Sequence, residues 1–416
     1  MSPAPVAPAK NTSSVMAGSE PVPVPGVRLG IAAAGIKTPG RPDLVVLELA
    51  AGSAVAAVFT RNAFCAAPVQ VAREHWQAGE SRYLLINTGN ANAGTGSQGL
   101  DDARATCSEL ARLCDVDANA VLPFSTGVIG EFLPMDRLLG GLPEALADLA
   151  ADRWEQAAAG IMTTDTRPKW ASRSTQVAGT PVTLTGIAKG AGMIRPDMAT
   201  MLGFVATDAA IEATALQALW REAVEYSFNR VTVDGDTSTN DAGVLVATGV
   251  AGNALVTDAA IPELDDFRTA LRELALELAQ ALVRDGEGAS KFVAIRVSAA
   301  RDEQEALAAA YTIAHSPLVK TALFASDPNW GRLLAALGRA GIDDLDVDRV
   351  ELRINDVLIA SEGGRAAGYS EESGQAAMAP TDIRIDFSLN RGDEEATVWT
   401  SDLSYDYVRI NAEYRT

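Results

Sequence analysis

Short apolar runs alternate with turn residues from Val27 to the end of the chain. The runs rich in Val, Ile, Leu and Ala, bounded by Gly, Pro, Asn and Asp, predict strands. The predicted strands are 43–49, 54–60, 82–88, 182–187, 201–206, 243–250, 292–297, 350–359, 383–389 and 397–403. Apolar residues that recur every three or four positions predict helices. The predicted helices are 101–113, 133–151, 152–162, 213–226, 262–283 and 331–339.

Elements of both kinds follow one another along the whole chain, and this mixture predicts a layered α/β architecture of the α+β kind. The 416 residues are enough for about two or three domains. Residues 1–25 are rich in Pro, Ala and Ser, so we expect them to form a disordered tail outside the core.

Acidic residues outnumber basic ones, 54 to 34, which gives a net charge of −20. Nucleic acids and anionic membranes bind basic surfaces, so neither is expected as a partner. Most of the excess lies from residue 200 onward, where 36 acidic residues face 18 basic ones. No block of five like charges occurs, and we therefore expect a solvated acidic surface rather than an acidic tail.

The cysteines, the histidines and the apolar runs exclude several classes of protein. Cys65, Cys107 and Cys114 form no C-x-x-C pair and are too few for a disulfide framework. His75 and His315 are too few for a His-rich metal site, and we expect both to be ordinary surface or interface residues. The chain has no run of 18 apolar residues and no secretory signal, so a cytoplasmic protein without a membrane span is expected.

The most unusual stretch is 186–202, GIAKGAGMIRPDMATML, which has three glycines and a proline. This composition predicts neither helix nor strand, while Met193, Ile194 and Met201 make the stretch apolar. We expect a buried loop whose backbone polar groups have specific partners. A linker that crosses between domains inside the core is the alternative.

This stretch and six others resemble the ornithine acetyltransferase family, the bifunctional glutamate N-acetyltransferases of arginine biosynthesis. The other stretches, in the family's order, are 125–130 (STGVIG), 162–169 (MTTDTRPK), 228–241 (FNRVTVDGDTSTND), 285–288 (DGEG), 327–332 (DPNWGR) and 411–416 (NAEYRT). Together with the strand pattern, the resemblance covers the chain from about residue 27 to its last residue.

The resemblance implies a self-processing fold of the N-terminal-nucleophile type, with mixed sheets sandwiched by helices and a smaller C-terminal α/β domain from about residue 290. It also implies a cut between Ala199 and Thr200, giving an α fragment that includes 26–199 and a β fragment of 200–416. A threonine hydroxyl is a poor nucleophile without a base. An N-terminal threonine supplies its own base, because the pKa of an α-amino group is roughly 7.7–8.0.

The implied reaction is a double displacement in which Thr200 takes acetyl from N-acetylornithine and passes it to glutamate. By the resemblance, Thr126 and Gly127 stabilise the tetrahedral oxyanion. The implied substrate-binding residues are Thr163 with its neighbour Thr164, Lys189, Thr200, Glu287, Asn411 and Thr416. No metal or cofactor is implied, and the implied assembly contains two α and two β fragments. Bifunctional members also accept acetyl-CoA, and the sequence leaves open whether this chain does.

Each of these positions has a plainer structural interpretation. Thr126-Gly127 could be a strand-to-turn junction, Lys189 a solvated loop lysine, and Thr163 or Thr164 a helix cap. The stretch 285–288 could be a helix stop, and the stretch 411–416 a docked terminal strand.

The stretch 229–241 is rich in hydroxyl, amide and carboxylate groups, and we expect it to support the nucleophile. A divalent cation held by Asp234, Asp236 and Asp241 is the competing interpretation.

Three other functions remain open at the level of the whole chain. The fold and processing are also compatible with an N-terminal-nucleophile aminopeptidase or amidohydrolase, which would transfer the acyl group to water. An acetyltransferase of specialised metabolism would share the same signature. A binding or scaffold protein that keeps only the fold is the non-enzymatic alternative. For the leading function, the acidic surface could favour the approach of cationic ornithine.

Overall fold

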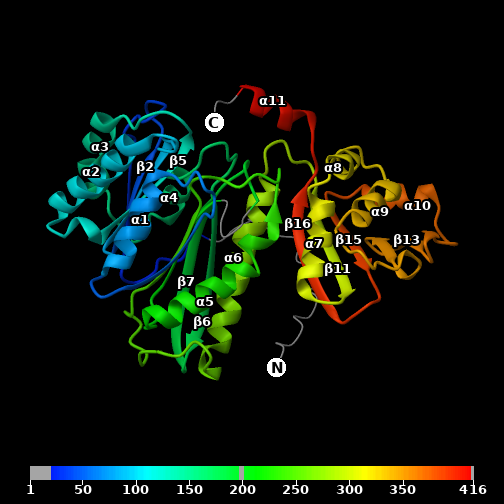
Figure 1. The fold of residues 1–416 in the computed structure, drawn as a ribbon. Coiled ribbons are helices and arrows are strands. Elements are labelled where there is room, and N and C mark those ends of the chain that lie inside the picture. Colours follow the sequence, from blue (N-terminus) through cyan, green and yellow to red (C-terminus); the bar gives the residue numbers. More distant parts are fainter. Residues whose placement is uncertain (1–19, 196–200, 414–416) are drawn as a thin grey trace.

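The computed structural model describes residues 20–195 and 201–413, and these residues form two lobes built on three mixed sheets (Figure 1). The first sheet has the order β1-β2-β4-β5. Its strands are β1 (Val27–Ala32), β2 (Leu44–Leu49), β4 (Tyr83–Asn90) and β5 (Val121–Val128). All neighbours are antiparallel except β4 and β5, which run parallel.

The second sheet has the order β3-β10-β8-β7-β6. Its strands are β3 (Ala54–Phe59), β6 (Lys169–Val177), β7 (Thr180–Lys189), β8 (Leu202–Thr207) and β10 (Ala242–Ala247). Only β8 and β10 are parallel neighbours. Every residue of β8 and β10 is buried, which explains why these strands are continuous apolar runs in the sequence.

The two sheets pack face to face, and helices cover their outer faces. The outer face of the first sheet packs against α1 (Ala67–Ala78), α2 (Gly96–Cys114) and α3 (Met135–Ala147). The inner faces share a core with α4 (Trp154–Gly160). The outer face of the second sheet is covered by α5 (Ala213–Glu225) and α6 (Asp265–Arg284). This arrangement of helix, sheet, sheet and helix confirms the predicted layered α/β class.

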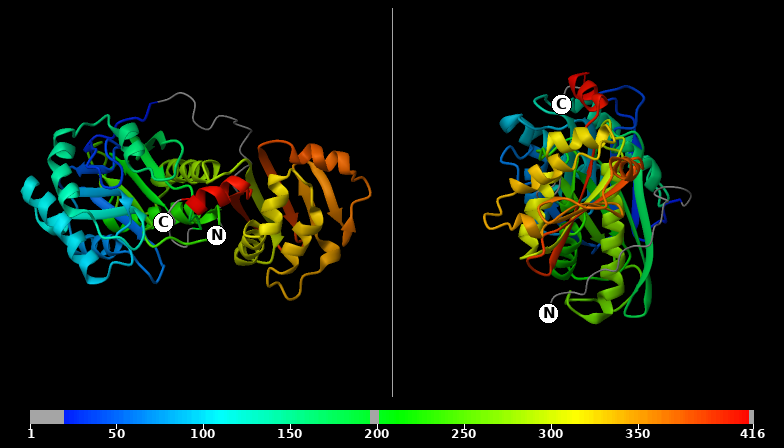
Figure 2. Two further views of the ribbon diagram at one scale, coloured as in Figure 1. Left: turned by 90° about the horizontal axis from the view of Figure 1, so that it is seen from above. Right: turned by 90° about the vertical axis from the view of Figure 1, so that its right-hand side faces the viewer.

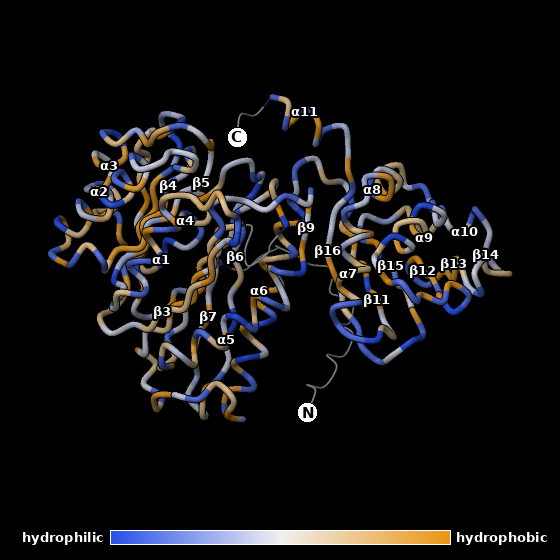
Figure 3. Tube along the Cα trace, in the orientation of Figure 1, coloured by the Kyte–Doolittle hydropathy of each residue, from blue (hydrophilic) through white to orange (hydrophobic). Residues whose placement is uncertain are grey.

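The second lobe contains a seven-stranded sheet of order β14-β13-β12-β15-β11-β16-β9. Its strands are β9 (Val231–Thr232), β11 (Phe292–Ala300), β12 (Glu351–Ile354), β13 (Val357–Ser361), β14 (Gly364–Arg365), β15 (Asp382–Ser388) and β16 (Glu394–Ser401). A separate core joins it to α7 (Glu303–Ala314), α8 (Pro317–Phe324), α9 (Trp330–Gly338) and α10 (Glu371–Met378). Buried and exposed residues alternate along β15, and Figure 3 shows the mixed hydropathy of this lobe.

Helix α11 (Tyr405–Glu413) ends the described chain and lies above the space between the two lobes (Figures 1 and 2). None of its residues is buried. Among the described residues, no helix combines the length and the apolar character that crossing a membrane requires.

Several expectations from the sequence are corrected by the structure. Residues 20–25 are not part of a disordered tail, because Val24 is fully buried and Pro25 O accepts a hydrogen bond from Thr248 Oγ1; residues 1–19 lie outside the described residues. The stretch 350–359 is two strands, β12 and β13, separated at Asn355, which has a φ of 50°. His75 is buried rather than at the surface, and its Nδ1 lies 2.8 Å from Val121 O.

The stretch 186–202 is also more regular than its composition predicts. Residues 186–189 complete β7, and Leu202 begins β8. Position 186 of the strand is occupied by glycine because the Cβ of any other residue would lie 2.9 Å from Val205 Cγ2 on the neighbouring strand. The irregular part of the stretch therefore begins at Gly190.

Candidate active site

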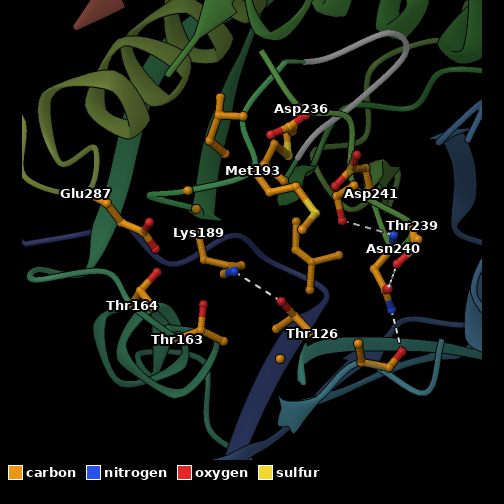
Figure 4. Close-up of a pocket in the computed structure, with 18 of the residues that line it drawn as sticks. Thr126, Thr163, Thr164, Lys189, Met193, Asp236, Thr239, Asn240, Asp241 and Glu287 are labelled. Carbon is orange, nitrogen blue, oxygen red and sulfur yellow. Dashed lines mark hydrogen bonds between the residues drawn. The ribbon is translucent and has the colours of Figure 1, made fainter. Parts of the chain in front are cut away.

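A cavity of about 250 Å³ lies where the ends of β5 and β7 meet the segment 234–241, helix α11 and Glu287, which follows the end of α6 by three residues (Figure 4). Six of the predicted site residues line it: Thr126, Gly127, Thr163, Lys189, Glu287 and Asn411. Ala199, Thr200 and Thr416 lie outside the described residues. Ile194 and Met201, which precede and follow the predicted cut, both line the cavity.

Lys189 is the last residue of β7, and its side chain reaches the cavity from the buried end of that strand. It is 8% exposed, so the interpretation as a solvated loop lysine is wrong. Its Nζ donates a hydrogen bond of 3.1 Å to Thr126 Oγ1. Burial lowers the pKa of Lys189, and the negative charge of Asp165 is the main influence that opposes this effect.

Thr126 and Gly127 lie within β5 and not at a strand-to-turn junction, because the strand continues to Val128. Gly127 has a φ of +137°, a conformation that favours glycine. A Cβ at this position would lie 2.3 Å from Gly89 C on the paired strand. The close approach of β4 and β5 therefore requires glycine here and leaves Thr126 at the cavity wall.

Glu287 and Asn411 line the cavity as a hydrogen-bonded pair. Asn411 Nδ2 donates to Glu287 Oε2 at 2.7 Å. Asn411 belongs to helix α11 and not to a docked terminal strand. Gly192 makes room for the carboxylate, because a Cβ there would lie 2.4 Å from Glu287 Oε2. Helix α6 ends at Arg284 with Asp285 as its C-terminal cap, so 285–288 also contains the helix stop.

Thr163 and Thr164 lie on the loop between α4 and β6, beside Glu287 in Figure 4. The backbone N–H of Thr163 donates to Asp165 Oδ2 at 3.0 Å. Helix α4 ends at Gly160 with Ile161 as its C-terminal cap, so neither threonine is the cap residue. The hydrogen bond to Asp165 fixes the loop instead.

The segment 234–241 holds the loop that precedes the predicted cut. Asp234 accepts hydrogen bonds from the backbone N–H groups of Met193 at 2.6 Å and Ile194 at 2.9 Å. Asn240 Nδ2 donates to Ala91 O at 2.6 Å and to Ser125 O at 2.9 Å, which fixes the backbone just before Thr126.

The carboxylates of this segment are not clustered like metal ligands. Within residues 20–195 and 201–413, no three His, Cys, Asp or Glu side chains are arranged to hold a metal ion, Asp234, Asp236 and Asp241 included. Burial raises the pKa of Asp241 well above its usual range. Among the described atoms, Asp241 Oδ2 is buried and lacks a hydrogen-bond partner. A carboxyl group that is easily protonated therefore faces the cavity.

Sequence reasoning gave no role to Asp165 and Lys169, although both lie in the quoted stretch 162–169. Lys169 is completely buried between Asp165 and Asp285. The four-residue spacing of Asp165 and Lys169 in TTDTRPK is compatible with an ion pair. The motif alone does not show that this pair is buried, because charged residues are usually exposed.

Comparisons with known proteins place the whole described fold in one family. A model of the ArgJ family matches residues 28–416. Two curated relatives named arginine biosynthesis bifunctional protein ArgJ, from Pseudomonas syringae pv. tomato and Pseudomonas fluorescens, are 58% and 56% identical over 394 residues, covering 95% of this chain and 97% of each relative. A crystal structure of arginine biosynthesis bifunctional protein ArgJ from Bacillus halodurans is 39% identical, covers 52% of this chain and 100% of that chain, and has a TM-score of 0.49. The chain therefore belongs to the ArgJ family.

Proposed function

We propose that this protein cuts itself between Ala199 and Thr200 and then transfers an acetyl group from N-acetylornithine to glutamate, giving ornithine and N-acetylglutamate. One observation carries the proposal: the chain on both sides of the predicted cut enters the cavity that Thr126, Lys189 and Glu287 line. Membership of the ArgJ family supports acetyl transfer in arginine biosynthesis rather than hydrolysis of a peptide.

Self-cleavage begins with attack of the Thr200 hydroxyl on the carbonyl carbon of Ala199. The peptide C–N bond then breaks, which moves the Ala199 acyl group onto the Thr200 oxygen as an ester and frees the α-amino group of Thr200. Water hydrolyses this ester, which releases the Ala199 carboxylate and restores the Thr200 hydroxyl. That amine then takes the hydroxyl proton when Thr200 attacks the acetyl carbon of N-acetylornithine, and ornithine leaves with the proton. Glutamate reverses these steps by attacking the acetyl-threonine ester with its amine.

Each half of the transfer passes through a negatively charged tetrahedral intermediate. Lys189 donates to Thr126 Oγ1 at 3.1 Å, which occupies a lone pair of the hydroxyl and leaves its proton free to donate into the cavity. The Thr126 hydroxyl and the Gly127 N–H then stabilise the oxyanion, with the Lys189 ammonium behind them.

Glu287 recognises the ammonium group of ornithine in this proposal. Asn411 occupies Oε2 of Glu287, so the other carboxylate oxygen is available to the substrate. Thr163 and Lys189 bind the polar groups at the opposite end of the substrate, and Thr416 is assigned a further contact by resemblance alone.

Three finer features belong to the same proposal. Acetyl-CoA acts as a second donor, in keeping with the word bifunctional in the names of the relatives; formation of N-acetylglutamate from acetyl-CoA and glutamate tests this. Two α and two β fragments assemble, which native mass measurement tests. The reaction takes place in the cytoplasm, where three free cysteines are compatible with a reducing environment.

Mass spectrometry of the purified, denatured protein tests the central claim. Wild type should give fragments of 199 and 217 residues from the 416-residue chain, and incubation with N-acetylornithine should add one acetyl group to the second fragment. Thr200→Ala should abolish both cleavage and transfer, whereas Thr214→Ala, at an exposed position in the same fragment, should abolish neither. An uncut wild-type chain with full activity would overturn the mechanism, and acetyl release that does not need glutamate would indicate a hydrolase.

A further inference from the structure

Lys169, the first residue of β6, lies at the centre of a buried ionic network. Its Nζ donates to Asp165 Oδ1 at 2.6 Å and to Asp285 Oδ2 at 2.6 Å. The side chains of Lys169 and Asp165 are 0% exposed, and that of Asp285 is 3% exposed. Water therefore contributes little to stabilising these charges, and each depends on the others.

Each carboxylate of the network also holds a backbone segment at the cavity. Asp165 Oδ1 accepts from Gly190 N at 2.7 Å, which fixes the residue directly after Lys189. Its Oδ2 accepts from Thr163 N at 3.0 Å. Asp285 accepts from the backbone N–H of Thr166 at 3.0 Å and from its hydroxyl, and it lies two residues before Glu287. One network therefore connects three segments of the substrate cavity.

The network also sets the electrostatic surroundings of Lys189. Four groups act on its ammonium: Asp165 just before β6, Lys169 at the start of β6, Asp241 just before β10 and Glu287 after α6. Asp165 is the largest influence that favours the charged ammonium, whereas Lys169 acts against it. Asp165 and Lys169 therefore have opposite effects on the same group, although they form one ion pair.

We infer that Asp165 and Lys169 are positioning residues that fix the place and the charge of the Lys189 ammonium at the cavity wall, an inference that rests on the proposed acetyl transfer. Asp165 holds the backbone beside Lys189 and keeps Lys189 protonated at the pH of the reaction. Lys169 connects Asp165 to Asp285 and limits how much negative charge Lys189 encounters.

The pH dependence of kcat/KM separates this role from a merely structural one. Transfer needs a protonated Lys189, so activity should fall on the alkaline side as Lys189 loses its proton. Asp165→Asn removes a negative charge and lowers the pKa of Lys189, which moves the alkaline limb to lower pH by about one unit. Lys169→Met removes a positive charge and raises the pKa of Lys189, so the same limb should move to higher pH.

The experiment uses the full chain, with N-acetylornithine and glutamate as substrates and initial rates measured across the alkaline range. Lys189→Arg assigns the limb, because arginine keeps its proton and the limb should disappear from the range. Asp208→Asn is the matched control. Counted over the whole residue, Asp208 and Asp165 are equally exposed at 7%, and Asp208 Oδ1 accepts from Thr183 N at 2.7 Å near the other end of β7. This control should leave the limb in place. Lys169→Gln serves if the methionine variant does not fold.

Opposite displacements of the limb in the Asp165 and Lys169 variants support the inference. Displacements in the same direction, an unmoved limb or the lack of an alkaline limb in active wild type overturn it. These results differ from a failure of the proposed function, which would appear as a wild-type chain that is neither cut nor able to transfer acetyl and would remove both conclusions.

Discussion

The hydroxyl of Thr126 is the part of the site whose contribution can be isolated most cleanly. Thr126→Val keeps the shape of the side chain on β5 and removes only the hydroxyl, which accepts from Lys189 Nζ at 3.1 Å. Loss of one oxyanion donor lowers kcat by about 100- to 1,000-fold, or about 2.7–4 kcal/mol of transition-state stabilisation. The free energy of unfolding should fall by about 1–3 kcal/mol, because the buried Lys189 ammonium loses its hydrogen-bond acceptor on Thr126.

Initial rates of acetyl transfer measure this effect. The oxyanion exists only in the tetrahedral states, so kcat should fall while KM for N-acetylornithine stays within about threefold of wild type. Thr88→Val is the control. Thr88 pairs with Thr126 across β4 and β5, is 2% exposed and donates its hydroxyl to Gly160 O at 3.4 Å, and neither Thr88 nor Gly160 lines the 250 Å³ cavity. That variant should keep its kcat, and Thr126→Ser should recover most of the lost rate.

Two results would refute the reasoning about Thr126. A kcat for Thr126→Val within about threefold of wild type would mean that the hydroxyl does not meet developing charge. A raised KM with unchanged kcat would mean that Thr126 binds substrate in the ground state instead.

Two further variants test other walls of the cavity. Gly192→Ala places a Cβ 2.4 Å from Glu287 Oε2 and should displace the carboxylate from Asn411. KM for N-acetylornithine should then rise about tenfold, equal to about 1.4 kcal/mol, while self-cleavage still goes to completion. An unchanged KM would contradict the assignment of Glu287 to substrate binding. Asp234→Asn weakens the hydrogen bond that Asp234 accepts from the backbone N–H of Met193, whose φ of 55° is strained for a non-glycine residue. Cleavage of the 416-residue precursor, followed in a time course, should therefore slow by about tenfold. Tyr407→Phe, which removes only a 3.4 Å contact to Asp234, should cleave at the wild-type rate, and equal rates for both variants would show that Asp234 has no part in cleavage.

The elements that the sequence predicts best are those with a regular pattern of buried residues. β8 and β10 are buried on both faces, so each is a continuous apolar run that predicts a strand. Helix α11 is not among the predicted helices, and none of its residues is buried, so it lacks the core-facing side by which an amphipathic helix is usually identified. The prediction that residues 20–25 belong to a disordered tail is wrong, because the segment is rich in proline and only one of its residues, Val24, is buried in the core.

The site shows a similar limit. Resemblance to a family indicated Thr126, Lys189, Glu287 and Asn411, and the fold brings all four to one cavity. Their charged supports could not be predicted, because Lys169 and Asp285 are 116 residues apart and charged residues are expected at the surface. Only the folded chain brings the end of α6 next to the start of β6.

The proposed cut before residue 200 separates two fragments that both contribute strands to the same sheet. In the second sheet, β3, β6 and β7 precede the cut, whereas β8 and β10 follow it. β8 pairs with β7 over six residue pairs, and β10 pairs with β3 over another six. Both junctions lie inside the core that the two sheets share, so separating the fragments would expose buried strands on each side. The fragments must therefore stay together after cleavage without a covalent link, and cleavage would change the chemistry at Thr200 while the surrounding fold is kept.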